Sequence, residues 1–465
     1  MGYINIFVPG RVSIIGELSD LVVDYKKINN KVISGEVVAG GIDKGIYAVA
    51  SLSNDFIFEF HEKKCIIKNA ELSKLKELAK DSNFFSYVSS VAYYMKKNYD
   101  VSGINVKVRY MSLPMQKGLS SSASICVLVT KAYNILYNLN LTTTDIMEIA
   151  YKAERYALSM CGRLDQICAK GLCLSHIIFN EDSLKIETLD VKKELNFVIT
   201  DLNGFKDTKK TLNSIHKCFP FPKNENEELV RKTLCEDNKK LVRGAIEAIK
   251  NGNKKTLGKI LLQAQSNLDN SIGKICDTFE GKLLHTVMND EVIQKLSYGS
   301  KGTGSNGDGA IIILARNKKN QKEIINYLST KYKMISFEYN IKKTYKTKKA
   351  IINTLNNNFT KTKILSLLKK LNNLEIKEIL LIGNNKTIEN VKKVLNKEYS
   401  DIEFMNLTTK EKEKQIQLYR IYEKITFIEK NNSTQKDINI KTNLKSTIYI
   451  SSYNKELIKE KTNEE

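Results

Sequence analysis

The sequence predicts an α+β fold in two halves, followed by a small α/β appendage. Both halves mix short runs typical of strands with longer segments of helical periodicity. Near residue 345 the composition changes, because Asn and Lys become dominant and Gly nearly vanishes. A hydrophobic share of 42% is enough for a packed core. We therefore expect three structural parts.

The first part is predicted at residues 1–187 and the second at 188–343. In the first, strand-like runs lie at 4–10, 12–17, 45–52 and 104–113, and helical patterns at 124–139 and 144–158. The second opens on a strand-like run at 194–204, continues with helical patterns and ends in the apolar run Ala310–Ala315 before another helix. Each part therefore reads as an α+β domain.

The third part is predicted at residues 344–465. Residues 377–385 and 386–399 have the pattern of a strand, a turn and a helix, and further strand-like runs lie at 422–430 and 446–453. We expect a small α/β appendage that is disordered after about residue 455.

Several classes of protein are disfavoured by composition. No apolar run approaches the roughly 18 residues that span a bilayer, and the first ten residues lack the basic and apolar regions of a signal peptide. We expect a cytoplasmic protein that does not engage a membrane. The eight cysteines form no CxxC pair and the four histidines are scattered, which favours reduced core thiols over disulfides or a zinc site.

The net charge of +22 allows two interpretations. One is the binding of anions, either nucleotide phosphates or nucleic acid. The other is a general Lys- and Asn-rich bias. Since the lysines are spread along the whole chain, and no RNA-binding signature or Trp accompanies them, we favour the bias and expect no nucleic-acid partner.

A Ser-rich string between a strand-like run and an apolar helix is the strongest local signal. It reads P-M-Q-K-G-L-S-S-S-A-S from Pro114 to Ser124. The hydroxyls and free N–H groups of Ser120, Ser121 and Ser122 would lie at a helix N-terminus, which favours phosphate. A plain Ser-rich helix cap without a ligand is the alternative.

This string resembles the phosphate motif of the GHMP kinase superfamily, which includes galactokinase and mevalonate kinase. The family pattern P-x-x-x-G-L-[GS]-S-S-A matches at every fixed position. The resemblance implies that the loop wraps the phosphates of ATP and that Ser122 helps to hold Mg²⁺. The implied nucleotide-binding residues are Pro114, Lys117, Gly118, Leu119, Ser120, Ser121, Ser122 and Ala123.

Two acidic residues follow, Glu154 in a helical stretch and Asp165 eleven positions later. One helix cannot place both at one site, whereas two elements joined by a turn at Met160–Gly162 can. The string Gly162–Gln166, G-R-L-D-Q, resembles the galactokinase version G-I-M-D-Q. The resemblance implies that Glu154 is a Mg²⁺ ligand and that Asp165 is a catalytic base or orients the acceptor hydroxyl. A solvated Glu and a helix-capping Asp are the alternatives.

The N-terminal string P-G-R-V-S-I-I-G-E-L-S-D, from Pro9 to Asp20, resembles the galactokinase signature P-G-R-V-N-L-I-G-E-H-T-D. The resemblance implies that Arg11 is catalytic, stabilising the transferring phosphoryl group. It also implies that Glu17 and Asp20 bind substrate hydroxyls together with Asp165. Leu18 stands where the family has His, so one polar contact to the sugar is lost.

The third motif, K-G-T-G-S-N-G-D-G from Lys301 to Gly309, resembles the family loop K-x-T-G-A-G-G-G-G and implies nucleotide-side roles for Gly302 and Gly304. Lys206, in a polar string after a strand, either reaches a phosphate or sugar or lies in a surface turn. The third part of the chain faintly resembles sugar-1-phosphate nucleotidyltransferases, but it lacks their G-x-G-T-R loop. A degenerate remnant and an unrelated α/β appendage are the two interpretations.

The resemblance spans roughly residues 5–340 and implies a GHMP kinase fold. That fold has an N-terminal half like domain 2 of ribosomal protein S5 and an α/β-sandwich C-terminal half. It also implies an enzyme that uses ATP and Mg²⁺ to phosphorylate a monosaccharide hydroxyl, the anomeric one. A weak or inactive sugar- and ATP-binding regulator on the same scaffold, and a mevalonate-like kinase, are the alternatives.

Overall fold

The computed structural model describes residues 3–81, 83–113, 120–159, 161–181 and 183–343, and the backbones of several strands beyond them. The chain divides into two compact units, the first running from Tyr3 to Thr344 and the second from Tyr345 to Glu465. The first unit holds both of the predicted α+β halves.

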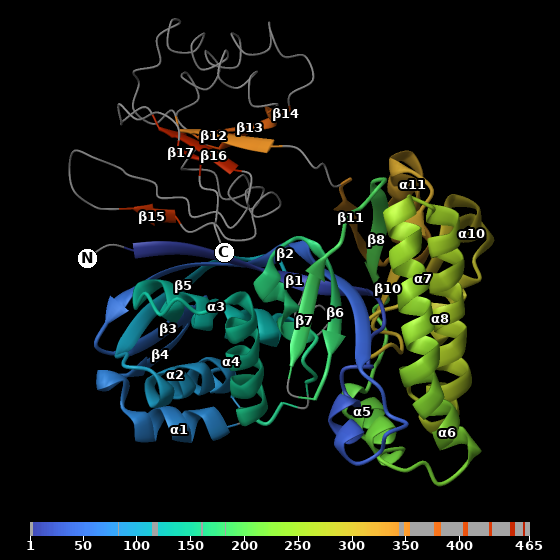
Figure 1. The fold of residues 1–465 in the computed structure, drawn as a ribbon, viewed down its shortest axis with the longest axis horizontal. Coiled ribbons are helices and arrows are strands. Elements are labelled where there is room, and N and C mark those ends of the chain that lie inside the picture. The colour runs from blue at the N-terminus through green and yellow to red at the C-terminus, as the bar shows by residue number, and fades with distance from the viewer. Residues whose placement is uncertain are drawn as a thin grey trace, which may run out of the picture. The chain divides into compact units, whose positions relative to one another are not determined.

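The N-terminal half is built on a mostly antiparallel sheet whose strands follow the order β1-β2-β5-β3-β4 (Figure 1). From β2 the sheet continues through β6 to β7. The strands are β1 (Tyr3–Ile15), β2 (Gly35–Ser53), β3 (Phe56–Phe60), β4 (Lys63–Ile67), β5 (Gly103–Met111), β6 (Leu174–Phe179) and β7 (Leu184–Thr188). The long β2 therefore connects the two arms of the sheet.

Four helices cover this sheet on one side (Figure 1). They are α1 (Leu72–Lys80), α2 (Ser86–Asn98), α3 (Ser121–Leu136) and α4 (Thr143–Tyr156). Helix α3 is central, because it contacts β1, β2 and β5 as well as α2 and α4. A short 3-10 helix, η3 (Asp165–Lys170), packs against α3, α4 and β1. This packing brings the start of α3, the end of α4 and the start of η3 together.

The C-terminal half is an antiparallel sheet between two layers. The strand order is β11-β8-β10-β9, with β8 (Leu195–Asp201), β9 (Ser297–Gly302), β10 (Ala310–Ala315) and β11 (Ile335–Ile341). Alternate residues of a strand point to opposite faces. One face packs on α7 (Asn238–Asn251) and α8 (Lys254–Ile275), and the other on α9 (Lys282–Met288), α10 (Glu291–Leu296) and α11 (Lys318–Tyr332).

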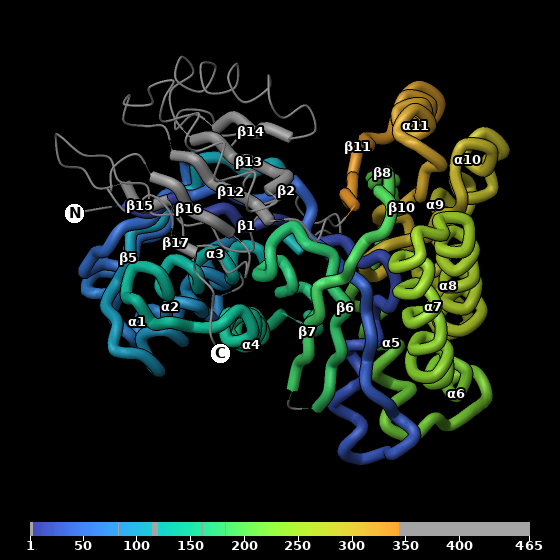
Figure 2. Tube along the Cα trace, turned by 45° about the horizontal axis from the view of Figure 1, so that its top comes forward, coloured from blue at the N-terminus to red at the C-terminus, as the bar shows by residue number. Residues whose placement is uncertain are grey.

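Before these helices, α5 (Thr208–Lys217), α6 (Glu225–Lys232) and a π-helical turn (Thr233–Asp237) lead into α7. The segment that follows β1 lies beside them in Figure 2. Tyr25 bonds His216 of α5 at 3.0 Å, and Asn29 donates to the carbonyl of Pro220 at 2.6 Å. The segment that follows the N-terminal string Pro9–Asp20 is therefore attached to the C-terminal half.

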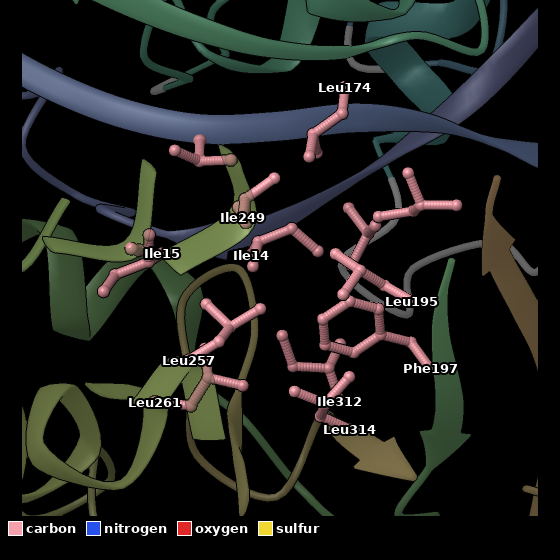
Figure 3. Close-up of a cluster of buried hydrophobic side chains, with 14 of the residues drawn as sticks. Ile14, Ile15, Leu174, Leu195, Phe197, Ile249, Leu257, Leu261, Ile312 and Leu314 are labelled. Carbon is pink, nitrogen blue, oxygen red and sulfur yellow. The ribbon is translucent and has the colours of Figure 1, made fainter. Parts of the chain in front are cut away.

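An apolar core cluster joins the two halves (Figure 3). Ile14 and Ile15 of β1 belong to the same buried cluster as Phe197 of β8, Leu257 of α8 and Ile312 of β10. Strand β1 is therefore shared by both halves, which places its side chains where the halves meet.

The predicted strand-like runs at 4–10 and 12–17 are not separate elements. They form the one continuous strand β1, which pairs with β2 along its length. The register shifts between Pro9 and Arg11 and again between Ser13 and Ile15, so bulges let one strand continue through both runs.

The second unit holds a largely parallel sheet in the order β14-β13-β12-β16-β17. Its strands are β12 (Lys348–Asn353), β13 (Ile376–Ile382), β14 (Glu403–Leu407), β16 (Thr447–Ser451) and β17 (Lys459–Glu460), and β15 (Phe427–Glu429) is a further strand. The predicted helix at 386–399 lies outside the described residues. Of the tail predicted as disordered after about residue 455, only β17 is described.

Two further findings concern the whole described chain. Within the described residues no helix combines the length and apolarity needed to cross a bilayer. All eight cysteines are free thiols, as the absence of paired spacings predicts.

The first prediction concerns a chain truncated after Lys343. The core clusters lie within residues 3–343, so the shortened chain should unfold in one cooperative transition. We expect its Tm to lie within about 2 °C of the full chain's first-unit transition, a change of about 1 kcal/mol or less. Calorimetry on both chains checks this. Loss of cooperative unfolding after truncation would show that the second unit is needed for the fold of the first.

Candidate active site

Asp165 is the centre of a converging group of donors. The Arg11 guanidinium, from β1, donates through Nε to Asp165 Oδ1 at 3.0 Å, and a second guanidinium nitrogen donates to the same oxygen. Ser120 Oγ also donates to Oδ1, at 2.8 Å. Arg11 is buried, whereas the side chain of Asp165 is 24% exposed. Within the described part of the chain these bonds all fall on Oδ1, so Oδ2 is the oxygen left for a ligand.

Glu154 forms a second polar centre beside the first. It lies in the last turn of α4 and is 1% exposed. Ser122 Oγ donates to Oε1 at 2.7 Å, and Gln166 Nε2 donates to Oε2 at 2.8 Å. Burial, together with the charge of Asp165, raises the pKa of Glu154 to about 7. A carboxylate in this state near neutral pH favours a bound cation or a proton.

The two acids therefore come from two elements that meet at one place. Glu154 ends α4 and Asp165 begins η3, as their spacing predicts. Met160 in the predicted turn lies outside the described residues. Gln166, the last residue of the string G-R-L-D-Q, follows Asp165 directly and donates to Glu154, so it links the two acids.

The start of α3 does not behave as a plain serine cap. Ser120 occupies the N-cap position with φ 59°, in the left-handed region, and its side chain makes no capping bond. Its hydroxyl instead donates a hydrogen bond to Asp165, and the hydroxyl of Ser122 donates one to Glu154. Ser121 stands in the first turn, and Ala123 is buried. The N-terminal N–H groups of α3 therefore keep their capacity to bind an anion.

Residues 114–119 of the phosphate string lie outside the described residues, and they include the predicted nucleotide-binding residues Pro114, Lys117, Gly118 and Leu119. The string is tied to β1 on its described side, because Ser124 Oγ donates to the carbonyl of Pro9 at 2.9 Å. The N-terminal string Pro9–Asp20 and the phosphate string Pro114–Ser124 are thus in direct contact.

Asp20 lies against the peptide that precedes Asp165. Its Oδ2 accepts the N–H of Leu164 at 3.0 Å. Burial raises the pKa of Asp20 to about 6, with a further contribution from the charge of Asp165. A Cβ at Gly162 would overlap the Asp20 carboxylate, which explains the glycine in G-R-L-D-Q.

Glu17 is placed differently from the expectation that it faces substrate hydroxyls. Its carboxylate is paired with Lys301, and the two side chains are 2% and 0% exposed. Ser13 Oγ donates to the same carboxylate at 3.4 Å. In the sequence, the position of Lys301 at the start of the string Lys301–Gly309 is the one signal that points to this residue.

Leu18 lies in an apolar environment. Its backbone has φ 71°, in the left-handed region, and its side chain is 6% exposed. It packs in a buried cluster that includes Leu212, Ile215 and Phe279 from the C-terminal half. The position of the family histidine is therefore occupied by a core residue.

The third motif, Lys301–Gly309, contacts the N-terminal string Pro9–Asp20. Gly302 donates its N–H to Gln265 Oε1 at 2.8 Å, and Thr303 Oγ1 donates to the carbonyl of Ser13 at 3.3 Å. Gly304 has φ 70°, which a residue with a side chain adopts only with strain. Lys206 lies along this loop, because Cβ atoms at Gly307 and Gly309 would meet its side chain.

Comparison with known proteins agrees with this geometry. A family model for the N-terminal domain of GHMP kinases matches residues 86–171, from α2 to the end of η3. Over 333 residues the chain is 24% identical to the galactokinase of Thermotoga petrophila, which covers 66% of this chain and 88% of that protein. Over 371 residues it is 26% identical to the galactokinase of Clostridium acetobutylicum, covering 71% and 90%.

Solved structures share the fold. The structure of Lactococcus lactis galactokinase complexed with galactose matches with a TM-score of 0.58 and 19% identity, over 73% of this chain and 93% of that one. Methanococcus jannaschii mevalonate kinase matches with a TM-score of 0.55 and 19% identity, over 73% and 98%. The predicted α+β fold of the GHMP type is confirmed. Residues 86–171 therefore match the N-terminal domain of GHMP kinases, and the chain is similar in sequence to galactokinases and in fold to galactokinase and mevalonate kinase, which supports a phosphotransferase with an alcohol group as acceptor.

Proposed function

We propose that this chain is an ATP-dependent kinase that transfers the γ-phosphoryl group to a hydroxyl of a neutral monosaccharide, the anomeric one. The observation that carries the proposal is the convergence of Arg11 and Ser120 on Asp165, beside Glu154 and Ser122. A cation, a hydroxyl-orienting carboxylate and a helix N-terminus are the parts that phosphoryl transfer requires.

The residues present fit ATP with Mg²⁺. The start of α3 is suited to phosphate, and Ser122 and Glu154 offer the hard oxygen donors that Mg²⁺ prefers. Across the described residues there is no group of three or more His, Cys, Asp or Glu able to hold a metal. When bound, Mg²⁺ neutralises charge on the phosphates. On this proposal Gly302 and Gly304 support the nucleotide loop from behind.

Asp165 and Arg11 take different roles in the reaction. The Oδ1 atom of Asp165 is held by Arg11 and Ser120, so Oδ2 accepts the hydrogen bond of the acceptor hydroxyl and orients its oxygen toward the phosphorus. The Arg11 cation, fixed beside this carboxylate, stabilises negative charge that spreads over the transferring group.

The charges around the acceptor position favour a neutral sugar over a mevalonate-like acid. Asp20 and Asp165 lie close enough for their charges to interact, and Arg11 is already paired. A third carboxylate, on the substrate, would be repelled. Asp20 is instead suited to accept a bond from a sugar hydroxyl. The galactose complex of the Lactococcus lactis galactokinase supports a sugar for this fold.

A binding protein without turnover is the second candidate function. The buried Leu18 at the place of a polar family residue favours it slightly. The retained Arg11, Glu154 and Asp165, with the bonds described above, favour the kinase. Release of ADP separates these two functions.

The second prediction is ADP release from Mg-ATP in the presence of a neutral monosaccharide. Since Leu18 is turned into the core, no side chain at that position replaces the histidine bond to the sugar. We expect fucose or arabinose to be preferred over galactose, within the range of about 10- to 200-fold that an apolar contact provides per methylene. A coupled ADP assay that compares kcat/KM for the three sugars measures this.

Two results of that assay would count against the proposal. No turnover with any neutral sugar, from folded protein that binds ATP, would favour the binding protein. A preference for galactose would show that another residue makes the bond of the missing histidine, and the inference from Leu18 would fail.

The third prediction concerns Asp165→Asn. The amide keeps the size of the side chain but loses the charge that orients the hydroxyl, so kcat should fall by about 10²- to 10⁴-fold. ATP affinity should change little. The control is Asp100→Asn, at an exposed position. Turnover of Asp165→Asn near that of the wild type would exclude Asp165 from the reaction.

The fourth prediction follows from the raised pKa of Glu154. A carboxyl whose pKa rises from 4.5 unfolded to about 7 folded stabilises the fold most when protonated. The ligand-free protein should therefore lose up to about 3 kcal/mol of stability as pH rises from 4.5 to 7. Glu154→Gln should remove this part of the dependence.

Urea unfolding at pH 5 and pH 8, for the wild type and for Glu154→Gln, measures the effect. The exposed Glu247→Gln serves as the control. At pH 8 the free energy of unfolding of Glu154→Gln should be higher than that of the wild type. The rate of ADP release by this variant should no longer depend on the Mg²⁺ concentration. Equal pH dependence in both proteins would contradict the assignment of a raised pKa to this side chain.

A further inference from the structure

We infer that Lys301 and Glu17 form a positioning pair that holds Asp20 in place for the acceptor sugar. The inference rests on the proposed sugar kinase function. It changes the role of Glu17 from a group that touches substrate to one that acts through Asp20, and it gives a role to Lys301.

The pair is fully enclosed. Lys301 is the next-to-last residue of β9, and its Nζ donates to the Glu17 carboxylate and to the carbonyl of Gly302, the latter at 2.6 Å. Neither side chain reaches solvent to more than 2%. Two charges removed from water in this way stabilise each other only as a pair, and removing one leaves the other uncompensated. The pair therefore fixes the position of Glu17 relative to β9.

Glu17 belongs to a tight turn that ends at Asp20. Gly16 has φ 99° and Leu18 has φ 71°, so two of its residues adopt left-handed backbone conformations. For leucine this conformation is strained and persists only when the surroundings impose it. Ser19 Oγ donates to the carbonyls of Gly16, at 2.7 Å, and Glu36, at 3.2 Å. Lys301 supplies the ionic constraint on this turn.

The turn sets the position of Asp20, which lies on the acceptor side of the site. Asp20 accepts the N–H of Leu164, the residue before Asp165. The nucleotide side has different attachments, because Ser120 and Ser122 are held by Asp165 and Glu154, and Ser124 by Pro9. Loss of the Lys301–Glu17 pair should therefore weaken use of the sugar and leave use of ATP nearly unchanged.

A double-mutant cycle tests this inference with Lys301→Met, Glu17→Gln and the two combined. Each single change leaves one buried group without its partner, and misplacement by about 1 Å can cost about 10²-fold in rate. We expect the KM for the sugar to rise in both single variants, with kcat/KM lower by about 10²-fold. The combined variant, neutral at both positions, should recover most of that loss, and the KM for ATP should change less than twofold in all three variants.

Lys331→Met is the matched control. Lys331 also pairs with a buried carboxylate, that of Asp290 at 2.7 Å, but on α11 in the C-terminal half. It should leave the KM for the sugar unchanged. Should Lys301→Met fail to fold, Lys301→Arg keeps the charge on a larger group, and we expect a raised KM for the sugar at a Tm close to that of the wild type.

Three results would overturn the inference. If Lys301→Met keeps the wild-type KM for the sugar while Glu17→Gln and the combined variant are equally impaired, then Glu17 touches the sugar itself. If Tm falls in the single variants but the kinetic constants do not change, the pair is only structural. If Tm shows no coupling between the two changes, the pair does not form. The double-mutant cycle measured by Tm does not depend on turnover. Absence of activity in the wild type would therefore contradict the proposed function without deciding whether the pair forms.

Discussion

The ion pair between Arg11 and Asp165 is the interaction on which the rest of the site depends. Arg11 is buried on β1, where its guanidinium needs a carboxylate beside it. Asp165 is presented by a short 3-10 helix that packs against α3, α4 and β1. Since Ser120 donates to the same oxygen, one carboxylate joins the first strand, the start of α3 and η3. The order of these elements around Asp165 creates the place for a phosphate on one side and a hydroxyl on the other.

Strand β1 can carry this arrangement because it belongs to the core of both halves. Ile14 and Ile15 pack with the sheet and helices of the C-terminal half, while β2 pairs with β1 along its whole length. The turn that follows β1 is held from the C-terminal side by Lys301. A small-molecule acceptor bound near Asp20 would therefore be positioned by both halves of the first unit. This gives a physical reason for the dependence of the proposed sugar site on the third motif.

The site is maintained at some cost to stability. Burial raises the pKa of Asp20 to about 6 and that of Glu154 to about 7, so both side chains are held in surroundings that disfavour their charged forms. Groups perturbed in this way are typical of functional sites, where the charge is needed for a ligand. The backbone of Leu18 adds strain at the same place. These features are a consequence of burial and could not be recognised from a motif.

Local sequence patterns are sufficient to predict the kinds of element, the residues of the three motifs and the need for two elements to bring Glu154 and Asp165 together. These are properties of local periodicity and spacing, which are written along the chain. The folded chain was needed to show that β1 is one strand, that Leu18 faces an apolar cluster and that Glu17 is paired with Lys301, 284 positions away. Such partners are chosen by the packing of distant elements around a common core, and no local pattern encodes which distant side chain will arrive beside a buried charge.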